Sequence, residues 1–473
     1  MRDSENHFKS KIKSDMPLYI ALFLINAAWL CIFLQMMPLG DDWGYYTTPL
    51  GLGINFTRFF DGLIGVLLTS FPSLFPWFNR VLLAVLHFVN CITFYKFALN
   101  VLKQNKQYSR LFTVLFSISP WIYASIAQTD AMNNLLAFTP GIIGAYLYFK
   151  TENETRGNIY YIVFSILSLC GKESGAAFIA VIPATILIRV IHGELSINTA
   201  INRIFRSYLL GIILFLIYFR ITFGIRTSDS ASRSLRGLLS AIAFPFFSFT
   251  GVNTFDVYNG FWINTIIGVI LSAPLLVFAF ANFCKLAKNK DKLALIAILL
   301  FIFGELFLLP IQLFSSVTDM HIYLVAFFTL LIILYFLPKD KKRLAGILMS
   351  LCFISFIISD CEKLYWQNIS SGYVREFQSE AFSLIGEAPK KLHIISPGFD
   401  IDKMTYRYPG IADGQFASNS NGRSLYPVYG YDKPINIIKY DLDDNIEEIL
   451  KTIPEDHTIL IVYPDKALKI VNN

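Results

Sequence analysis

Long apolar runs alternate with short polar connections along most of the chain, a pattern that predicts membrane-spanning helices. A helix needs about 20 apolar residues to cross a bilayer, and about 17 are tolerated. Eleven runs approach or reach this length: 17–37, 79–102, 110–127, 131–149, 158–171, 175–192, 207–224, 263–284, 293–313, 321–337 and 343–359. The run 158–171 is short for a span, so we expect a broken or tilted helix there.

Two other regions have a different pattern. The apolar stretch 56–71 carries Arg58 and Asp61, so we expect a helix that lies along the membrane interface. After 359 the long runs stop, and short β-like runs follow at 391–397, 434–440 and 458–464, with a helical period at 445–453. We therefore predict a polytopic all-α membrane domain of about 11 helices over 1–359 and a small α/β domain over 360–473.

Loop charge predicts the orientation of these helices. If the N-terminus is cytoplasmic, the inside segments carry 20 Lys and Arg residues and the outside segments carry 5. Positive charge accumulates on the cytoplasmic side of membrane proteins. This bias puts 38–77 and everything after 359 on the extracytoplasmic side.

Composition agrees with a membrane protein. Of the 473 residues, 55% are hydrophobic and 16% are charged, and the mean hydropathy is +0.52. The net charge of +6 follows from the loop lysines and arginines, so nothing calls for a nucleic-acid partner. The six cysteines form no C-x-x-C pair, which indicates buried thiols and no zinc site. The first apolar run is too long for the core of a signal peptide, and no small-residue cleavage pattern follows it.

The first candidate for chemistry is the acid pair Asp41 and Asp42, directly after the first predicted span. Neighbouring carboxylates repel each other, which raises the pKa of one of them. Such a group can take a proton from an acceptor hydroxyl, or the pair can hold a divalent cation. Trp43 and Tyr45 follow and can stack on a sugar ring. A solvated loop with interfacial aromatic residues explains the same residues equally well.

The second candidate is Lys172 with Glu173, which interrupt an otherwise apolar stretch. A charged side chain within a membrane-spanning segment has a high free-energy cost, so its presence indicates a functional role. Lys172 can hold a lipid phosphate, and Glu173 can orient it. Gly171 and Gly175 would let the backbone approach a ligand closely. The alternative is a short hairpin whose charges reach water.

Four further residues face the same side. Asp130 begins a helix, where a capping role is the simpler interpretation. His321 is either an interfacial side chain or part of a substrate site. Arg58 and Arg226 can bind phosphate, although snorkelling to lipid headgroups explains most such arginines.

The predicted cytoplasmic loops hold plain Lys and Arg residues and no Gly-rich phosphate loop. No ATP or nucleotide-sugar site is therefore evident. Chemistry on the outer face without nucleotides calls for an activated donor that is carried by a membrane lipid.

Over roughly residues 1–360 this layout resembles the GT-C superfamily of integral-membrane glycosyltransferases. The resemblance rests on "DDW" at 41–43, on Asp130 in the next outer loop, and on "GKES" followed by Pro183. It implies a polyprenyl-phosphate-linked sugar donor, with a separate donor synthase and flippase. It also implies inverting transfer to a surface glycan, with Asp41 or Asp42 as the base and a cation at the lipid phosphate.

The resemblance further implies the bacterial inner membrane, and the "DDW" opening is similar to that of O-antigen glucosyltransferases. The chain departs from the family pattern in having Asp-Asp where Asp-Glu is usual. The arginine-rich lipid-phosphate signatures of some subfamilies are not evident. The segment after 359 matches no module of the family.

Two alternatives stay open. An O-antigen polymerase or ligase would depend on outer arginines such as Arg226, Arg233 and Arg236. A lipid-linked-sugar flippase or another transporter would need polar groups near the membrane midplane and internal pseudo-symmetry. The sequence offers only Glu305 as a polar group near the midplane. It shows no internal repeat that would indicate pseudo-symmetry.

Overall fold

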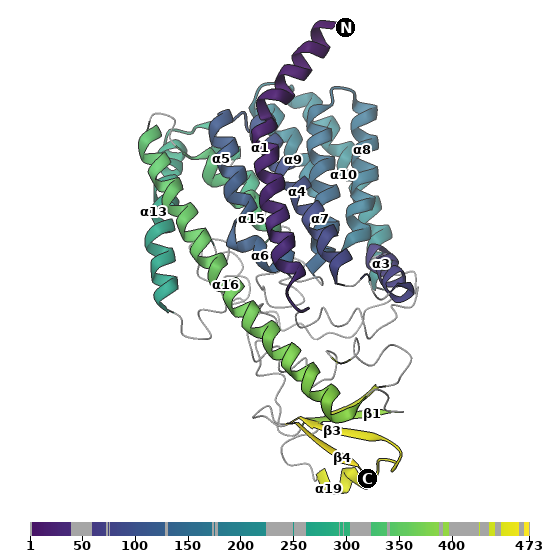
Figure 1. Ribbon diagram of the computed structural model, residues 1–473. Coiled ribbons are helices and arrows are strands. Elements are labelled where there is room, and N and C mark those ends of the chain that lie inside the picture. The colour runs from purple at the N-terminus through teal and green to yellow at the C-terminus, as the bar shows by residue number, and fades with distance from the viewer. Residues whose placement is uncertain are drawn as a thin grey trace.

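The protein is described here by a computed structural model. It describes residues 2–38, 59–71, 74, 76–127, 131–172, 175, 178–223, 249, 262–292, 294–296, 298–302, 323–337, 341–386, 391–396, 425, 435–439, 446–462 and 468–472. Helices form a bundle, and a small sheet lies beyond one end of it (Figure 1). We call that end of the bundle the sheet-side end, and the end where the chain begins the opposite end.

Among the residues that the structure describes, four helices are long and apolar enough to cross a membrane. They are α1 (Arg2–Leu34), α4 (Trp77–Asn100), α13 (Trp262–Lys288) and α16 (Lys342–Ile385). This confirms a mostly helical chain that could span a membrane, whereas the eleven spans expected from the sequence stay a prediction. The domain boundary after 359 and the orientation in the membrane also stay predictions.

Eight further described helices belong to the bundle. They are α3 (Phe59–Ser70), α5 (Lys106–Ser117), α6 (Pro120–Ala127), α7 (Met132–Lys150), α8 (Glu154–Gly171), α9 (Phe178–Ile191), α10 (Ile197–Phe223) and α15 (Tyr323–Tyr335). The 12 residues of α3 rise about 18 Å, which is too short to cross a bilayer. That α3 is a helix is confirmed, and its placement along an interface stays a prediction.

The run 110–127 is not one helix, which corrects the sequence interpretation. The chain forms α5 and then α6, with the break at Ile118 and Ser119. Pro120 explains the break, because proline has no N–H to donate and disfavours helical geometry in the residue before it. At its other end α5 begins earlier than expected, since the side chain of Asn105 accepts a hydrogen bond from the backbone N–H of Gln107.

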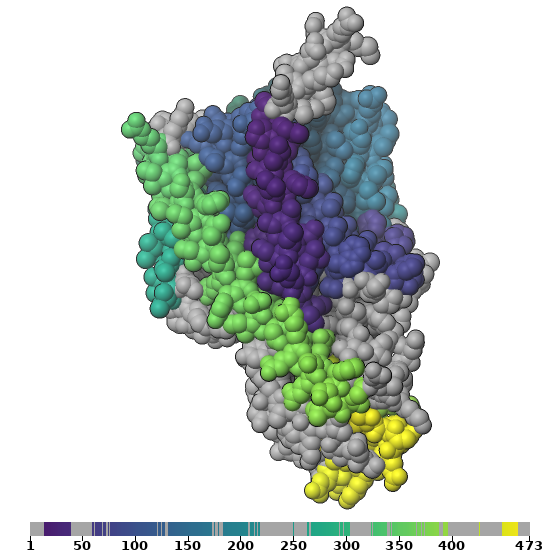
Figure 2. Space-filling model, in the orientation of Figure 1, coloured from purple at the N-terminus to yellow at the C-terminus, as the bar shows by residue number. Residues whose placement is uncertain are grey.

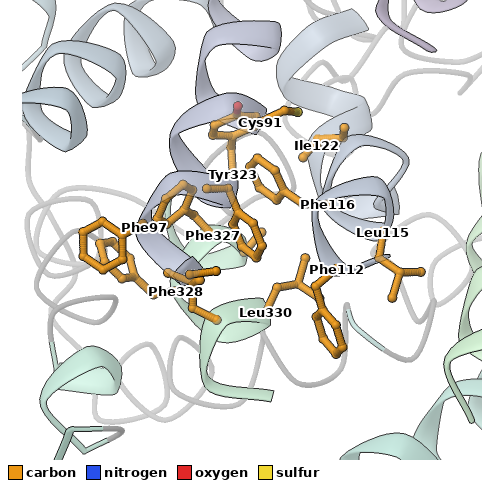
Figure 3. Packing of buried hydrophobic residues seen from close by; sticks show 14 of the residues in the cluster. Cys91, Phe97, Phe112, Leu115, Phe116, Ile122, Tyr323, Phe327, Phe328 and Leu330 are labelled. Carbon is orange, nitrogen blue, oxygen red and sulfur yellow. The ribbon is translucent and has the colours of Figure 1, made fainter. Parts of the chain in front are cut away.

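Aromatic rings from four helices fill the centre of the bundle (Figure 3). Phe94 of α4 stacks on Phe116 of α5 with ring centroids 5.1 Å apart. Phe327 of α15 meets the edge of Phe116 at 5.6 Å and packs on Phe138 of α7 at 5.2 Å. Aromatic pairs at these separations contribute beyond the area that they bury, so they fix how α4, α5, α7 and α15 pack.

At the opposite end a buried carboxylate joins α1, α4 and α5. Asp15 is 2% exposed and accepts hydrogen bonds from the Tyr95 hydroxyl at 2.8 Å and the Arg110 guanidinium at 2.9 Å. Lys106 Nζ lies 2.8 Å from the same oxygen. A buried charge is tolerated when it is paired and hydrogen-bonded, so this cluster ties three helices together.

Helix α16 is much longer than the predicted run 343–359. It has 44 residues, or about 66 Å at the usual rise, and it carries the chain from the bundle to the sheet (Figures 1 and 2). It ends at Gly386, whose φ of 75° is a conformation that glycine adopts readily. The sequence interpretation stopped at 359 because charges return there, yet a helix can continue into water.

Four strands form the C-terminal sheet: β1 (Leu392–Ser396), β2 (Ile435–Lys439), β3 (Thr458–Val462) and β4 (Leu468–Asn472). Their order is β2-β1-β3-β4, with β1 parallel to both neighbours and β4 antiparallel to β3. The short helix α19 (Ile446–Leu450) precedes β3. The three predicted strands and this helix are confirmed, and β4 is an additional strand.

Only three of the six cysteines are buried, so the prediction of buried thiols is wrong for the other three. Cys91, Cys170 and Cys352 are buried, whereas Cys31, Cys284 and Cys361 are exposed on the helix surfaces. All six are free thiols, as expected from their spacing.

Candidate functional site

Among the predicted site residues, Lys172 is described. The others lie outside the described residues: Asp41, Asp42, Trp43, Tyr45, Arg58, Asp130, Glu173, Arg226 and His321. Their roles stay predictions, and the described residues next to them in the chain show what surrounds the proposed site.

Lys172 directly follows the last residue of α8, at the sheet-side end of the bundle. Its backbone is extended, and its N–H donates to the carbonyl of Ser168 at 3.5 Å. Its side chain is half-buried. The lysine therefore ends a helix at a boundary between the packed interior and the surroundings, which is compatible with the predicted contact to a phosphate.

Gly171 and Gly175 are close-packing residues, which corrects the interpretation that they admit a ligand. A Cβ atom at Gly171 would lie 2.4 Å from the backbone nitrogen of Ala137, on α7. A Cβ atom at Gly175 would lie 2.3 Å from the Ser168 carbonyl oxygen. The Ser168 hydroxyl donates to the Ala137 carbonyl at 2.6 Å and fixes the same contact. The space beside these glycines is filled by protein.

Two buried amides begin α7, a few residues after Asp130. Asn133 is 2% exposed and Asn134 is fully buried. The side-chain oxygen of Asn133 has no hydrogen-bond partner among the described residues. An unsatisfied buried amide oxygen is costly, so this position marks a polar spot at the sheet-side end.

Arg80, in the first turns of α4, fixes the end of α1. It is 2% exposed. Its guanidinium donates to the carbonyl oxygens of Phe33 and, at 2.7 Å, Met36. The last carbonyls of a helix have no partner within the helix, so a buried arginine both satisfies them and favours the helix end electrostatically.

Helix α16 holds the same segment from the other side. The backbone N–H of Met37 donates to the Ser371 hydroxyl at 3.1 Å, and Arg375 donates to the Gln35 carbonyl. Residues 33–37 are therefore fixed between α4 and α16, directly before the segment that carries the acid pair. We call these contacts the α1 clamp.

Next to the clamp, α16 and α6 bury a polar cluster. Lys363 is 4% exposed, donates to the Pro120 carbonyl at 2.8 Å, and places its ammonium 5.7 Å from the Tyr123 ring centroid. The Tyr123 hydroxyl donates to the side-chain oxygen of Gln367. Asp360, 5% exposed, interacts electrostatically with both Lys363 and Tyr123. One of its carboxyl oxygens has no hydrogen-bond partner among the described residues.

The sequence analysis missed this cluster, although a signal was available. Asp360, Lys363, Gln367 and Ser371 follow at spacings of three, four and four residues, which puts them on one face of a helix. About 27 Å separates Asp360 from the start of α16, close to the thickness of a bilayer core. If the helix predicted at 343–359 had been continued past 359, the sequence would have predicted a polar stripe at the end of that helix.

A second polar group lies at the middle of α4, where the sequence analysis expected none. His87 and Asn90 are fully buried, and both contact the Tyr323 hydroxyl at 2.9 Å. His87 Nε2 lies 3.3 Å from the Ser117 carbonyl, which can only accept, so Nε2 donates and Nδ1 accepts from Tyr323. Both ring nitrogens of His87 and the Tyr323 hydroxyl have partners within the aromatic core, which indicates a packing role, whereas the side-chain oxygen of Asn90 has none among the described residues.

The described residues hold no group of three or more His, Cys, Asp and Glu side chains that could bind a metal ion. The divalent metal expected as a possibility at Asp41 and Asp42 stays a prediction.

No protein-family model matches this chain, and no curated protein is significantly similar to it.

Proposed function

We propose that the protein is a membrane glycosyltransferase that moves a monosaccharide from a polyprenyl-phosphate-linked donor to a surface glycan. Asp41 or Asp42 acts as the general base, and Lys172 binds the donor phosphate, with transfer on the extracytoplasmic face of a bacterial inner membrane. Trp43, Tyr45 and His321 would contact the sugars.

The α1 clamp is the observation that carries this proposal. Arg80 and Ser371 hold the chain at residues 33–37. Asp41 follows Met37 by four residues, and four residues of chain span at most about 14 Å. The acid pair therefore follows an anchored segment of the chain by only a few residues. A loop that merely meets solvent gains nothing from such an anchor, whereas a catalytic base needs one.

Lys172 supports the proposal from the same end of the bundle. Helices α4 and α8 run in opposite directions, so the start of α4 with Arg80 and the end of α8 with Lys172 both lie there (Figure 1). Negative charge grows on the leaving phosphate as the glycosidic bond breaks. A cation placed beforehand stabilises that charge more in the transition state than in the ground state.

The base completes the reaction. The acceptor hydroxyl passes its proton to the aspartate while its oxygen forms the new bond to the anomeric carbon, and the polyprenyl phosphate leaves with the bonding electrons. A positioned base contributes about 10²–10⁴-fold to such a step. The anomeric configuration inverts because the acceptor attacks the face opposite the phosphate.

The test uses the purified full-length chain with a polyprenyl-phosphate-sugar that carries a radiolabel. We expect Asp41→Asn or Asp42→Asn to reduce transfer at least 10²-fold, with unchanged expression and thermal stability. Lys172→Ala should raise the apparent KM for the donor. Asp456→Asn, at a side chain 62% exposed in the sheet domain, and Lys150→Ala, at an exposed residue at the opposite end, are the matched controls.

Full activity in both aspartate variants would refute the assignment of the base. An unchanged KM in Lys172→Ala would remove this lysine from the phosphate site. Loss of activity on substitution of Arg226, Arg233 and Arg236, with Asp41 and Asp42 dispensable, would favour a polymerase or ligase.

A further inference from the structure

A hollow of about 560 Å³ lies between α13 and α16 and is apolar on every side. Its walls include Ile270, Ala273, Val277 and Ala281 on α13, with Leu344 and Leu348 on α16. Ala273, Val277 and Ala281 follow at intervals of four residues, so they form one stripe along α13. The small alanine side chains on this stripe leave the space that larger residues would fill.

This groove opens toward the surroundings of the bundle. Ile270 and Val277, both in its wall, are 64% and 66% exposed. Because α13 and α16 are two of the four helices that could cross a membrane, their outer faces would contact lipid tails. An apolar groove at that position suits a hydrocarbon chain.

Cations gather where the groove reaches the opposite end of the bundle. Lys341 places its ammonium 5.9 Å from the ring centroid of Phe278, which also lines the groove. Lys285 and Lys288 lie in the last turn of α13, and exposed Arg343 lies in the first turn of α16. The neighbouring described acid is Asp291. The balance of charge there favours an anion.

We propose that this groove binds one acyl chain of an anionic glycerophospholipid, whose phosphate contacts Lys341. The site is distinct from the proposed donor site, because the start of α4, which carries Arg80, and the end of α8, which Lys172 follows, lie at the sheet-side end of the bundle (Figure 1). It does not depend on the glycosyltransferase proposal. A bilayer phospholipid is the favoured occupant because the groove is open along the membrane-facing side and its cations lie at one membrane surface.

The experiment measures lipid binding to the full-length protein in mild detergent by native mass spectrometry. Phosphatidylglycerol and phosphatidylcholine with identical chains are titrated separately. We expect one phosphatidylglycerol to bind more tightly than phosphatidylcholine. Val277→Trp should abolish this binding by filling the groove. Lys341→Gln should weaken phosphatidylglycerol binding about five-fold, since one lysine near an anionic lipid is worth about that factor. It should weaken phosphatidylcholine binding less, because the choline cation balances the charge of that lipid's phosphate.

Matched controls separate the site from general effects. Ile266→Trp adds the same bulk to α13 at a side chain 54% exposed that does not line the groove. Lys150→Gln removes an exposed cation from the same end of the bundle. Both should bind phosphatidylglycerol as the wild type does. Ala273→Leu gives a milder filling of the groove if Val277→Trp fails to fold, and it should also weaken binding.

Equal binding of the two lipids to the wild type would overturn the proposal. So would unchanged phosphatidylglycerol binding in both Ala273→Leu and Val277→Trp. Displacement of phosphatidylglycerol from the groove by an equimolar polyprenyl phosphate would also overturn it, because the groove would then hold the other class of lipid.

Discussion

Replacing Arg80 with methionine tests the α1 clamp directly. Methionine keeps an unbranched side chain of similar apolar length and removes the guanidinium with its donors. The wild-type guanidinium donates two hydrogen bonds, to the carbonyls of Phe33 and Met36. Hydrogen bonds that involve a charged group contribute about 1.5–3 kcal/mol each, which gives about 3–6 kcal/mol for the pair.

Two features of the site reduce the expected loss of unfolding free energy to the lower end of this range. The Phe33 carbonyl keeps a second donor, the backbone N–H of Met36 at 3.1 Å, so it is not left unsatisfied. Removing a buried charge also removes the cost of keeping it out of water. We therefore expect Arg80→Met to lower the free energy of unfolding by about 3 kcal/mol.

The measurement is unfolding of the purified protein in a detergent–denaturant titration, followed by tryptophan fluorescence. Arg206→Met is the matched control, because Arg206 pairs with Glu154 at the surface, with the two side chains 65% and 37% exposed. Such a pair contributes about 0–1 kcal/mol. Sugar transfer by Arg80→Met should also fall about 10²-fold, because a displacement of about 1 Å in a reacting group has that effect. If Arg80→Met is no less stable than Arg206→Met, the clamp does not hold the end of α1.

Three further predictions concern other parts of the fold. Gly171→Ala should lower the free energy of unfolding by about 1–3 kcal/mol, because the added Cβ would meet the backbone of α7. Gly346→Ala should raise the free energy of unfolding by about 0.5–1 kcal/mol, because no atom lies within 4 Å of its added Cβ. Thermal unfolding of the two variants distinguishes the two signs. Asn105→Ala should cost about 1 kcal/mol through loss of the α5 cap, measured in the same way. Burial, together with His457 at 2.8 Å, lowers the pKa of His393, so the neutral ring is favoured in the folded sheet. Its contribution to stability is complete above about pH 6.5 and declines as the pH falls below that value. The protection factors of amide exchange in β1 and β3, which are corrected for the intrinsic exchange rate, should therefore be lower at pH 5 than at pH 7, and should change less in His393→Gln.

The sequence predicted those elements whose boundaries coincide with a change in hydrophobic pattern. Helix α7 begins and ends within one residue of the run 131–149, and the first three strands match their β-like runs. It failed where the cause was not local. The end of α16 was misplaced because a helix supported by packing at both ends does not require an apolar sequence throughout.

The candidate site stays a prediction, although the sequence singled out one residue of it that the structure describes. Lys172 was singled out because a charge in an apolar stretch is conspicuous. Arg80 was not, since it lies in the first turn of α4, where charges are common, and Lys363 was not, since it lies beyond the predicted end of the run 343–359. Their partners are backbone carbonyls of distant segments, namely residues 33–36 and Pro120. No spacing in the sequence indicates such contacts, because they arise only when the helices pack.

Helix α16 links the two parts of the protein without an interruption. It contains no proline, it packs against β4 near its end, and the stripe from Asp360 to Ser371 lies along its middle. A stiff rod of this kind transmits rotation and tilt. A rotation or tilt of the sheet would therefore reach residues 35–37, which Ser371 and Arg375 of α16 contact directly.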